Sequence, residues 1–361
     1  MNKEFKVLIF AALPPPVGGV ASIAAMLHQS FAHRNDVCFV PPATKTARFS
    51  AANLRPLRNI VRLTLAIKRV KKGGGVLLFA SAGNSFFEKL FWALTIILFG
   101  RNVAMVMVDG NFPKFWDKCS PFLRRISSHI VCHPQLTLGA QSEAWQEYYR
   151  QAFPSACIKV VGATAAPEFF SHDREVYFPL RDISLLYVGW IIPEKGITDL
   201  LDAMVILNKT RPEVRLRLVG PLFGNDVYWN KVVADRGIST QVTFTGPISD
   251  RSSLIKEFDN ASVFVFPSHF EGFPVALLEA ITIGLACVGT SVGGIPDILD
   301  HGRAGIVVSP NAPLELANAL KSLFDDNELV ERYSKQAAMR ARNIYSHSEC
   351  IESYKRLLGL K

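Results

Sequence analysis

The chain has 361 residues, of which 49% are hydrophobic and 20% charged, a composition that excludes a disordered protein and predicts two domains of ordinary size. Six sparse cysteines, none in a Cys-x-x-Cys pair, favour reduced thiols in a cytoplasmic protein over disulfides or a zinc site. Residues 1–175 hold 21 Lys and Arg against 10 Asp and Glu, a net of +11, whereas residues 176–361 hold 19 against 21, a net of −2.

The chain begins with an apolar run at residues 7–13 that follows Lys3 and Lys6. The run is short, and three prolines follow it without a convincing cleavage site, so it predicts a buried first strand rather than a signal peptide. The apolar stretch 90–99 has about half the ~20 residues that a membrane-spanning helix needs. We interpret it as the end of a buried or partly interfacial helix.

A basic amphipathic helix is predicted within residues 48–72, because apolar residues interleave there with Lys and Arg. Its basic residues are Arg48, Arg55, Arg58, Arg62, Lys68, Arg69, Lys71 and Lys72. Such a surface can rest on anionic lipid, meet a phosphorylated acceptor or simply be solvated. Nucleic acid is disfavoured, since no recognised binding motif accompanies the charge.

Short apolar runs alternate with helical spacing along the whole chain. In the first half, strands are predicted at 7–12, 76–80, 103–108, 130–132 and 158–162, and helices at 20–31, 88–99, 121–128 and 141–151. After a looser stretch at 165–179, strands are predicted at 184–188, 214–220, 242–246, 261–267 and 286–290. Helices are predicted there at 196–208, 229–236, 250–259 and 274–284, and from Pro313 onward.

This alternation predicts parallel sheets that are covered by helices on both faces. Two such runs separated by a linker predict an α/β protein with two doubly wound, Rossmann-like domains. In that architecture ligands bind at the carboxyl ends of the strands, in the cleft between the domains. The residues just after strands are therefore the candidates for chemistry.

The most informative segment is 268–280, which follows a predicted strand. Pro274 suits a first helical position, and the amides at that terminus would stabilise an anion. Glu271 lies just before the helix and Glu279 a turn and a half into it, so two carboxylates would project towards a site that attracts phosphate and could accept hydrogen bonds from sugar or ribose hydroxyls. Alternatively, Glu271 caps the helix and Glu279 is an ordinary surface residue.

Three further loops link a strand to a helix. In the loop 189–196, a cation at Lys195 makes sense beside a helix N-terminus if a diphosphate lies between them, although a solvated lysine is the simpler reading. The glycine loops at 14–20 and 291–297 allow backbone to approach a ligand closely, but each by itself is a plain tight turn.

Together these segments resemble the retaining glycosyltransferases of family 4, which have the GT-B fold. Glu271 and Glu279 are spaced as in that family's paired-glutamate motif, and Gly189 with 193–196 matches its donor-phosphate loop. Residues 293–297 and 302–305 match the segment downstream. The resemblance covers nearly the whole chain and is strongest over residues 183–325.

The resemblance implies a role for each matching residue. Lys195 would bind the donor diphosphate, Glu271 the hydroxyls of the transferred sugar, and Glu279 the ribose. The other implied substrate-binding residues are Gly18 and Gly19 near the phosphates or the acceptor, Gly189 and Trp190 in the phosphate loop, Gly246 to Ile248 near the base, and Gly272 and Phe273 as backbone donors.

Two positions depart from the family pattern. Trp190 stands where the family often has an arginine, and Asp109 where it often has a histidine. Asp109 could accept a hydroxyl hydrogen bond or act as a base, and is a candidate catalytic residue with Glu271 and Lys195. No Asp-x-Asp metal motif follows a strand, so neither a metal nor a cofactor is expected.

The sequence thus predicts a metal-independent, hexosyltransferase-like enzyme that moves a sugar from a nucleotide-diphosphate sugar to a saccharide or lipid-linked acceptor in cell-surface polysaccharide synthesis. Residues 1–175 would bind the acceptor and 180–345 the donor, with a helix at about 346–361 packing back on the first domain. The protein would be cytoplasmic, in peripheral contact with anionic membrane and without nucleic acid. The alternatives are a non-catalytic nucleotide-sugar-binding subunit and a GT-B sugar-nucleotide epimerase.

Overall fold

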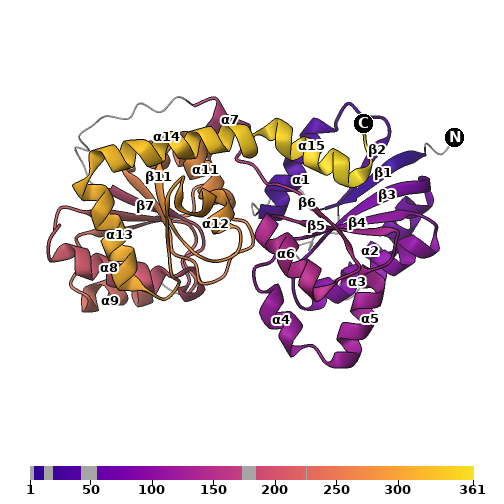
Figure 1. The fold of residues 1–361 in the computed structure, drawn as a ribbon, viewed down its shortest axis with the longest axis horizontal. Helices are drawn as coiled ribbons and strands as arrows, with labels where there is room; N and C mark the ends of the chain where they lie inside the picture. Colours follow the sequence, from indigo (N-terminus) through magenta and orange to yellow (C-terminus); the bar gives the residue numbers. More distant parts are fainter. Residues whose placement is uncertain (1–3, 12–18, 42–54, 173–183, 225) are drawn as a thin grey trace. The chain divides into compact units, whose positions relative to one another are not determined.

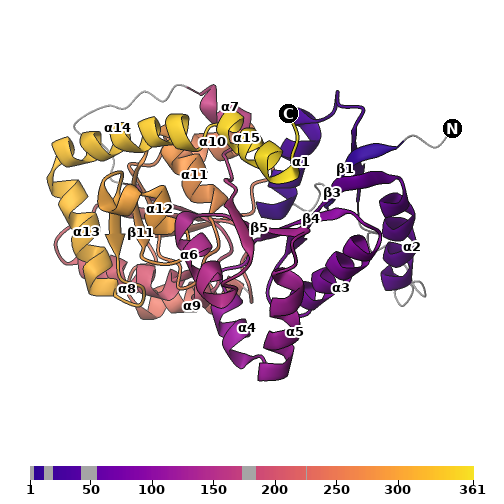
Figure 2. The same cartoon turned by 45° about the vertical axis from the view of Figure 1, so that its right-hand side comes forward.

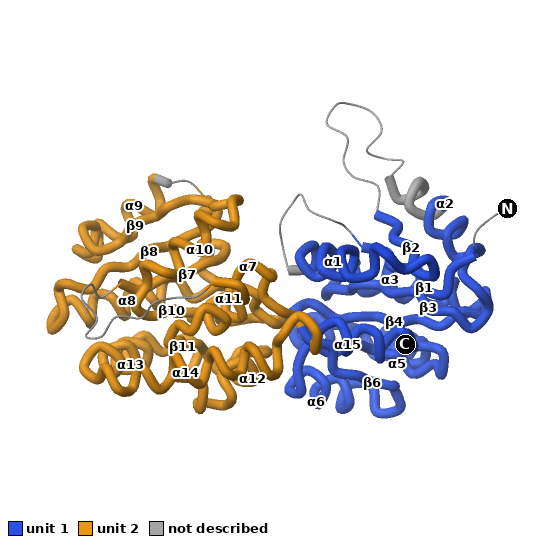
Figure 3. Tube along the Cα trace, turned by 90° about the horizontal axis from the view of Figure 1, so that it is seen from above, with its two compact units in different colours: residues 1–162, 350–361 blue, residues 163–349 orange. Residues whose placement is uncertain are grey.

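The computed structural model describes residues 4–11, 19–41, 55–172, 184–224 and 226–361. The chain divides into two compact units: unit 1 comprises residues 1–162 and 350–361, and unit 2 comprises residues 163–349 (Figure 3). In the described ranges, no helix combines the length and the apolar character that a membrane span would need.

Unit 1 is built on a six-stranded parallel sheet with the strand order β2-β1-β3-β4-β5-β6 (Figure 1). The strands are β1 (Phe5–Phe10), β2 (Val37–Val40), β3 (Val70–Ala80), β4 (Asn102–Met107), β5 (Leu136–Ala140) and β6 (Cys157–Val160). The helices are α1 (Gly19–Ser30), α2 (Arg55–Lys68), α3 (Asn84–Leu98), α4 (Phe112–Lys118), α5 (Pro121–Val131), α6 (Glu143–Ala152) and the greater part of α15 (His347–Leu358).

Unit 2 repeats this plan with the strand order β12-β11-β10-β7-β8-β9. Its strands are β7 (Ser184–Val188), β8 (Arg215–Val219), β9 (Val242–Gly246), β10 (Val263–Phe266), β11 (Ala286–Thr290) and β12 (Ile306–Val308). Its helices are α7 (Pro167–Phe170), η2 (Pro193–Lys195), α8 (Ile197–Asn208), α9 (Asp226–Asp235), α10 (Arg251–Asp259), α11 (Val275–Ile283), α12 (Ile295–Ile298), η3 (Asp300–Gly302), α13 (Pro313–Asp325) and α14 (Asn327–Ile344).

The apolar runs form strands because helices bury both faces of each sheet. In β10 all four residues of Val263–Phe266 are buried, as are all five residues of β11. Parallel strands buried on both sides need continuous apolar sequence rather than alternation, which is the pattern found here. The prediction of an α/β chain with two doubly wound, Rossmann-like sheets is confirmed.

Each sheet has one point where the strand order reverses. In unit 2 the chain adds β8 and β9 on one side of β7, then returns to place β10 on the other side. In unit 1 the corresponding point lies between β1 and β3. The helices that leave two neighbouring strands in opposite directions open a crevice at such a point, so the carboxyl ends of β7 and β10 are the place to examine in unit 2.

The strand predicted at 130–132 is wrong. Val131 instead ends α5, which begins after Ser120, whose side chain caps the helix by accepting from the Leu123 amide. Ser127 and Val131 are buried one helical turn apart, so the apolar residues belong to the inner stripe of a helix. The strand follows at Leu136–Ala140, and β2 and β12, which have four and three residues, were not predicted.

The division between the units falls at Gly162 and Ala163, earlier than the predicted boundary at 175–180. Residues after Gly162 already pack in unit 2: the Thr164 hydroxyl donates to the Tyr345 carbonyl at 2.6 Å, and the Phe169 ring meets the Phe258 ring edge-on. At the other end of the chain, α15 returns to unit 1, where the Ser353 hydroxyl accepts from the Gly162 amide at 3.3 Å.

Candidate functional site

The loops after β7 and β10 carry the two charged residues that the sequence singled out. Lys195 is the last residue of η2, and Glu271 lies between β10 and α11. The Lys195 Nζ lies 2.6 Å from the Glu271 Oε2, with the two side chains 24% and 15% exposed. The pair is thus partly desolvated yet still reached by solvent, so an incoming anion can compete with the carboxylate for the ammonium group.

Glycines let three strand-to-helix loops interlock around this pair. Gly196 has φ +69°, and a Cβ there would lie 1.8 Å from the Pro267 carbonyl oxygen. Gly293 has φ +55°, and a Cβ there would lie 1.9 Å from the Glu271 carbonyl oxygen. The Gly294 amide donates to the Gly272 carbonyl at 2.8 Å. These close approaches fix the Glu271 backbone between its neighbours, which is a preorganised arrangement.

His269 joins the same loops, a role that the sequence did not reveal. Its backbone amide donates to the Glu194 carbonyl at 3.1 Å, and its Nε2 lies 2.7 Å from the Asp199 Oδ2. Asp199 is in the first turn of α8. This second polar link ties the loop after β10 to the helix after β7, and only the folded arrangement brings the two residues together.

Two helix N-termini point their amides to this edge of the sheet. Helix α8 begins after Gly196 and α11 after Pro274, and neither cap residue makes a side-chain hydrogen bond to its helix. The first amides of a helix carry partial positive charge and favour an anion. With the Lys195 ammonium group, the edge is therefore suited to a phosphate or diphosphate.

The second glutamate of the motif pairs with a different cation. Glu279 is buried in α11, and its Oε1 lies 2.9 Å from the Arg251 Nη1. Burial raises the pKa of Glu279 to about 7, while the charge and hydrogen bond of Arg251 act in the opposite direction and Glu168 adds a small rise. Glu279 is therefore not an ordinary surface carboxylate. Arg251 was missed from the sequence because the residue is 28 positions away and on another helix.

Trp190 lies in the loop that follows β7, five residues before Lys195. Its side chain is 56% exposed, and its carbonyl accepts from the Tyr187 hydroxyl at 2.9 Å. Burial, with a contribution from the Glu271 charge, raises the pKa of Tyr187 well above its usual value, so the phenol remains a donor. A Cβ on Gly189 would lie 2.7 Å from the Tyr187 hydroxyl oxygen, so the turn packs closely against this phenol.

The carboxyl ends of β8 and β9 continue the edge of the unit 2 sheet at which Lys195 and Glu271 lie. The Gly220 amide donates to the Gly246 carbonyl at 3.0 Å, and a Cβ on Gly220 would lie 1.9 Å from the Gly189 carbonyl oxygen. Gly246 has φ +73°, and Ile248 behind it is half-buried. Phe223, three residues after Gly220, is 66% exposed, and its amide donates to the Ile191 carbonyl at 3.2 Å.

The remaining predicted residues fall in different places. Gly272 follows Glu271 in the loop, whereas the Phe273 ring is buried against Tyr345 with the ring centroids 5.7 Å apart, which leaves only its backbone for a ligand. Gly18 lies outside the described residues, and Gly19 opens α1. Glu271 and Glu279 share α11 and its leading loop but make separate ion pairs.

Asp109 belongs to unit 1, after β4. Its Oδ2 accepts from the Ala82 amide at 2.9 Å and its Oδ1 from the Asn111 amide at 2.7 Å. Ala82 follows β3, so the carboxylate joins two loops at the carboxyl edge of this sheet. A carboxylate has about four acceptor sites, and two of them are used here.

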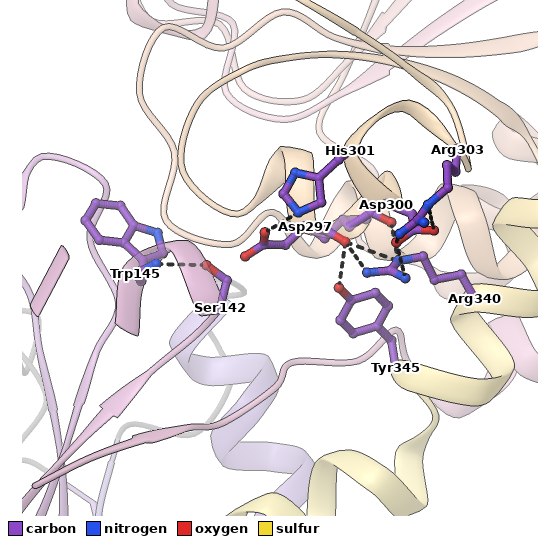
Figure 4. A network of polar contacts seen from close by, with 9 residues as sticks. Ser142, Trp145, Asp297, Asp300, His301, Arg303, Arg340 and Tyr345 are labelled. Carbon is purple, nitrogen blue, oxygen red and sulfur yellow. Dashed lines mark hydrogen bonds and ion pairs between the residues drawn. The ribbon is translucent and has the colours of Figure 1, made fainter. Parts of the chain in front are cut away.

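A polar network braces the loop downstream of Gly294 (Figure 4). The Asp297 carbonyl accepts from Arg340 Nη2 at 2.6 Å and from the Tyr345 hydroxyl at 3.0 Å, and its carboxylate lies 3.3 Å from His301 Nε2. Asp300 pairs with both Arg303 and Arg340. The network ties the short helix α12 to the end of α14, and so supports the glycine turn that contacts Glu271.

Within the described part of the chain, no cluster of three or more His, Cys, Asp or Glu could hold a metal ion. At the carboxyl edge of the unit 2 sheet, Lys195 and the N-termini of α8 and α11 offer positive charge to an anionic ligand.

Residues 170–340 match the family model described as glycosyl transferases group 1. The D-inositol 3-phosphate glycosyltransferase of Pseudarthrobacter chlorophenolicus is 36% identical over 162 residues, which cover 44% of this chain and 38% of that protein. The alpha-D-kanosaminyltransferase of Streptomyces kanamyceticus is 30% identical over 237 residues, which cover 63% of this chain and 61% of that one. The matched part is thus less than two thirds of each relative's own length.

The solved structure of Anabaena Alr3699/HepE in complex with UDP superposes over 99% of this chain and 100% of that one, with a TM-score of 0.74 and 18% sequence identity. At this identity the likeness establishes the fold alone. The fold is GT-B, as the sequence resemblance implied.

Proposed function

We propose that the protein transfers a sugar from a nucleotide-diphosphate sugar to a saccharide or lipid-linked acceptor. The proposal starts from the GT-B fold and from the match of residues 170–340 to the glycosyl transferases group 1 model. The observation that carries the proposal is the Lys195–Glu271 pair, held by interlocked loops at the switch point of unit 2. It places a cation, a carboxylate and two helix N-termini at one edge of one sheet.

Each part of the donor has a matching group. Lys195 and the amides at the starts of α8 and α11 bind the diphosphate. Glu271, released from Lys195 by the incoming phosphate, accepts hydrogen bonds from hydroxyls of the transferred sugar. Glu279 accepts those of the ribose. UDP in the Anabaena structure supports a nucleoside diphosphate as the leaving group.

The remaining substrate contacts follow the loops. Gly189, Gly272 and Phe273 offer backbone atoms to the diphosphate and the sugar, and Trp190 covers the rim. The segment from Gly246 to Ile248 lies along the base. In unit 1, Asp109 accepts a hydrogen bond from an acceptor hydroxyl. Gly18 and Gly19, where the chain enters α1, contact the phosphates or the acceptor.

The reaction breaks the bond between the anomeric carbon and the diphosphate oxygen and forms one to the acceptor oxygen. Negative charge develops on the departing oxygen, where Lys195 stabilises it. The family implies retention of configuration, so the acceptor attacks from the face that the diphosphate leaves, and the departing phosphate takes the acceptor's proton. Lys195 and the helix termini supply the positive charge that a divalent ion would otherwise provide, which makes transfer metal-independent.

The test is a thermal-shift screen of the pure protein against nucleoside diphosphates and nucleotide sugars, repeated with Lys195→Ala and Glu279→Ala. A ligand at ~100 times its dissociation constant adds about 2.7 kcal/mol to stability. We expect a shift for one base, lost in both variants, and turnover of the matching nucleotide sugar. The absence of a shift with every nucleotide would overturn the donor site.

A non-catalytic nucleotide-sugar-binding subunit is the second candidate. It is favoured by Trp190, which replaces a phosphate-binding arginine of the family, and by Asp109, whose two oxygens already accept backbone amides. Hydrolysis of the donor in the absence of an acceptor separates the candidates, because a binding subunit would give a thermal shift but no hydrolysis.

We further propose that the enzyme acts at the cytoplasmic face of a membrane in cell-surface polysaccharide synthesis. The basic first half supports this placement through its net charge of +11, counted over residues 1–175.

A further inference from the structure

Helix α3 is apolar on two sides. Its inner side buries Phe86, Leu90 and Ile96 in the core of unit 1. Its outer side exposes Phe91 by 57%, Leu94 by 44% and Leu98 by 79%, at the spacing of one helical stripe. A helix covered by water on its outer side would normally be polar there, so this stripe requires an apolar partner or a large hydration cost.

The neighbouring helices continue the exposed apolar surface. Helix α5 packs against α3, and all three helices α2, α3 and α5 bury side chains in one core cluster against the sheet of unit 1, so they form one layer (Figure 2). We define the outer apolar face by the exposed side chains on this layer: Val61, Leu65, Phe91, Leu94, Leu98, Phe122, Leu123 and Ile126. These are eight of the sixteen large hydrophobic side chains exposed in the described chain, so they are a concentration rather than scattered residues.

The same layer is strongly cationic. Helices α2, α3 and α5 together contain seven Lys and Arg against one Glu. Arg62 and Lys68 on α2 and Arg125 on α5 are exposed. The one glutamate, Glu88, is 3.0 Å from Lys89, and Arg124 of α5 is 3.9 Å from Asp117 of α4. Apolar side chains therefore stand among cations that have few local counter-charges.

We infer that the outer apolar face docks on an anionic lipid surface, with the apolar side chains entering the interface and the cations meeting the headgroups. An apolar face among cations fits a partner that offers both hydrocarbon and negative charge. A second copy of this chain fits less well, because a two-fold contact would bring the cations of both copies together. The inference rests on the proposed function in one respect: docking would hold unit 1 at the surface where a lipid-linked acceptor lies.

The experiment is sedimentation of the full chain with phosphatidylcholine vesicles, with and without a third of phosphatidylglycerol. We expect binding to the anionic vesicles that weakens as salt rises. The variant Phe91→Ser/Leu98→Ser/Phe122→Ser should lower the partition coefficient at least about tenfold, because each substitution removes one large apolar side chain from the interface. Arg62→Gln/Arg125→Gln should remove much of the preference for the anionic vesicles.

The matched control is Leu314→Ser/Met339→Ser/Ile344→Ser, which removes three apolar side chains of unit 2 that are 60%, 56% and 52% exposed. It should bind vesicles as the unchanged protein does. Equal loss in both triple variants, or no binding of the unchanged protein to anionic vesicles, would overturn the inference. A dimer in solution that dissociates in the triple variant Phe91→Ser/Leu98→Ser/Phe122→Ser would also overturn the inference, since a second copy would then cover the outer apolar face.

A nucleotide thermal shift measured without vesicles separates this inference from the proposed function. If the unchanged protein binds vesicles but shifts with no nucleotide, the proposed function fails while the docking surface stands. If it shifts with a nucleotide but stays in the supernatant, the docking surface fails while the donor site stands. The triple variant Phe91→Ser/Leu98→Ser/Phe122→Ser should keep the nucleotide-induced thermal shift of the unchanged protein.

Discussion

Units 1 and 2 have six-stranded parallel sheets of the same plan, but they differ in where their exposed chemistry lies. In unit 2 it lies in loops at the carboxyl edge, where Lys195 and Glu271 pair between glycine turns. In unit 1 it lies on the outer surface of helices, where Phe91, Leu98 and Phe122 are exposed among cations. The first arrangement suits a small charged ligand and the second an extended surface.

This difference shows that a shared fold does not fix which kind of ligand each unit recognises. A strand-to-helix loop is short and held at both ends, so it can fix a charge or an amide at a defined place. The outer side of a helix cannot enclose a small ligand, but it presents a stripe of side chains to a surface. The same fold therefore supports two kinds of recognition, and the position of the residues within it decides which kind.

The largest effect is expected from a substitution that removes the cation of the Lys195–Glu271 pair in unit 2. Lys195→Ala should lower the transfer rate by a factor of about 10²–10³, because one preorganised group on the leaving oxygen is lost. Steady-state kinetics with the donor found by thermal shift is the measurement. Lys321→Ala is the control, since it removes an exposed lysine that pairs with Asp325 on α13. A loss below about tenfold would show that Lys195 does not meet the leaving group.

The next effect tests the interlocked loops themselves. Gly196→Ala introduces a Cβ 1.8 Å from the Pro267 carbonyl oxygen at φ +69°, whereas Gly237→Ala has φ +67° with open space around it. The conformational cost of about 1–2 kcal/mol is common to both, so the difference measures the close packing. We expect Gly196→Ala to lower the Tm clearly more than Gly237→Ala and to abolish the nucleotide shift. Equal melting temperatures would mean that the loops can separate freely.

The third effect concerns Glu279. Because burial raises its pKa from 4.5 to about 7, the folded protein holds this proton more tightly than the unfolded chain. The resulting stabilisation is complete below about pH 4.5 and is lost as the pH rises through about 7, a change of at most about 3 kcal/mol. Glu279→Gln should therefore gain stability relative to the unchanged protein between about pH 5 and about pH 8.

Thermal melts at both pH values measure this gain, and nucleotide binding should be weaker in the same variant. Glu257→Gln is the control, because Glu257 pairs with Arg217 at 2.7 Å on the same unit but away from the paired-glutamate motif. If the stability difference between Glu279→Gln and the unchanged protein were the same at both pH values, the proton would not be held more tightly in the fold.

The smallest effect concerns Asp109 in unit 1. Asp109→Asn keeps one acceptor oxygen but loses the other, so it should cost about 1 kcal/mol of stability through the loops at Ala82 and Asn111. If Asp109 also receives the acceptor, transfer should fall more than donor hydrolysis does. An equal fall in both rates would assign the residue to the loops alone.

The sequence predicts the alternation of strands and helices, because strands buried on both faces need continuous apolar runs and the covering helices need periodic ones. It also located the loops that carry Lys195 and Glu271, since glycines and charges directly after a strand are a local pattern. The strand predicted at 130–132 failed because three apolar residues fit the inner stripe of α5 equally well.

The tertiary structure determines which groups meet. Arg251 reaches Glu279, and His269 reaches Asp199, through packing between helices and loops that are far apart in the chain. It also decided that α3 has an outer apolar side, because its composition is the same whether the helix is buried or at a surface. Side-chain partners and exposure depend on what the rest of the chain places alongside, and that is not a local property of sequence.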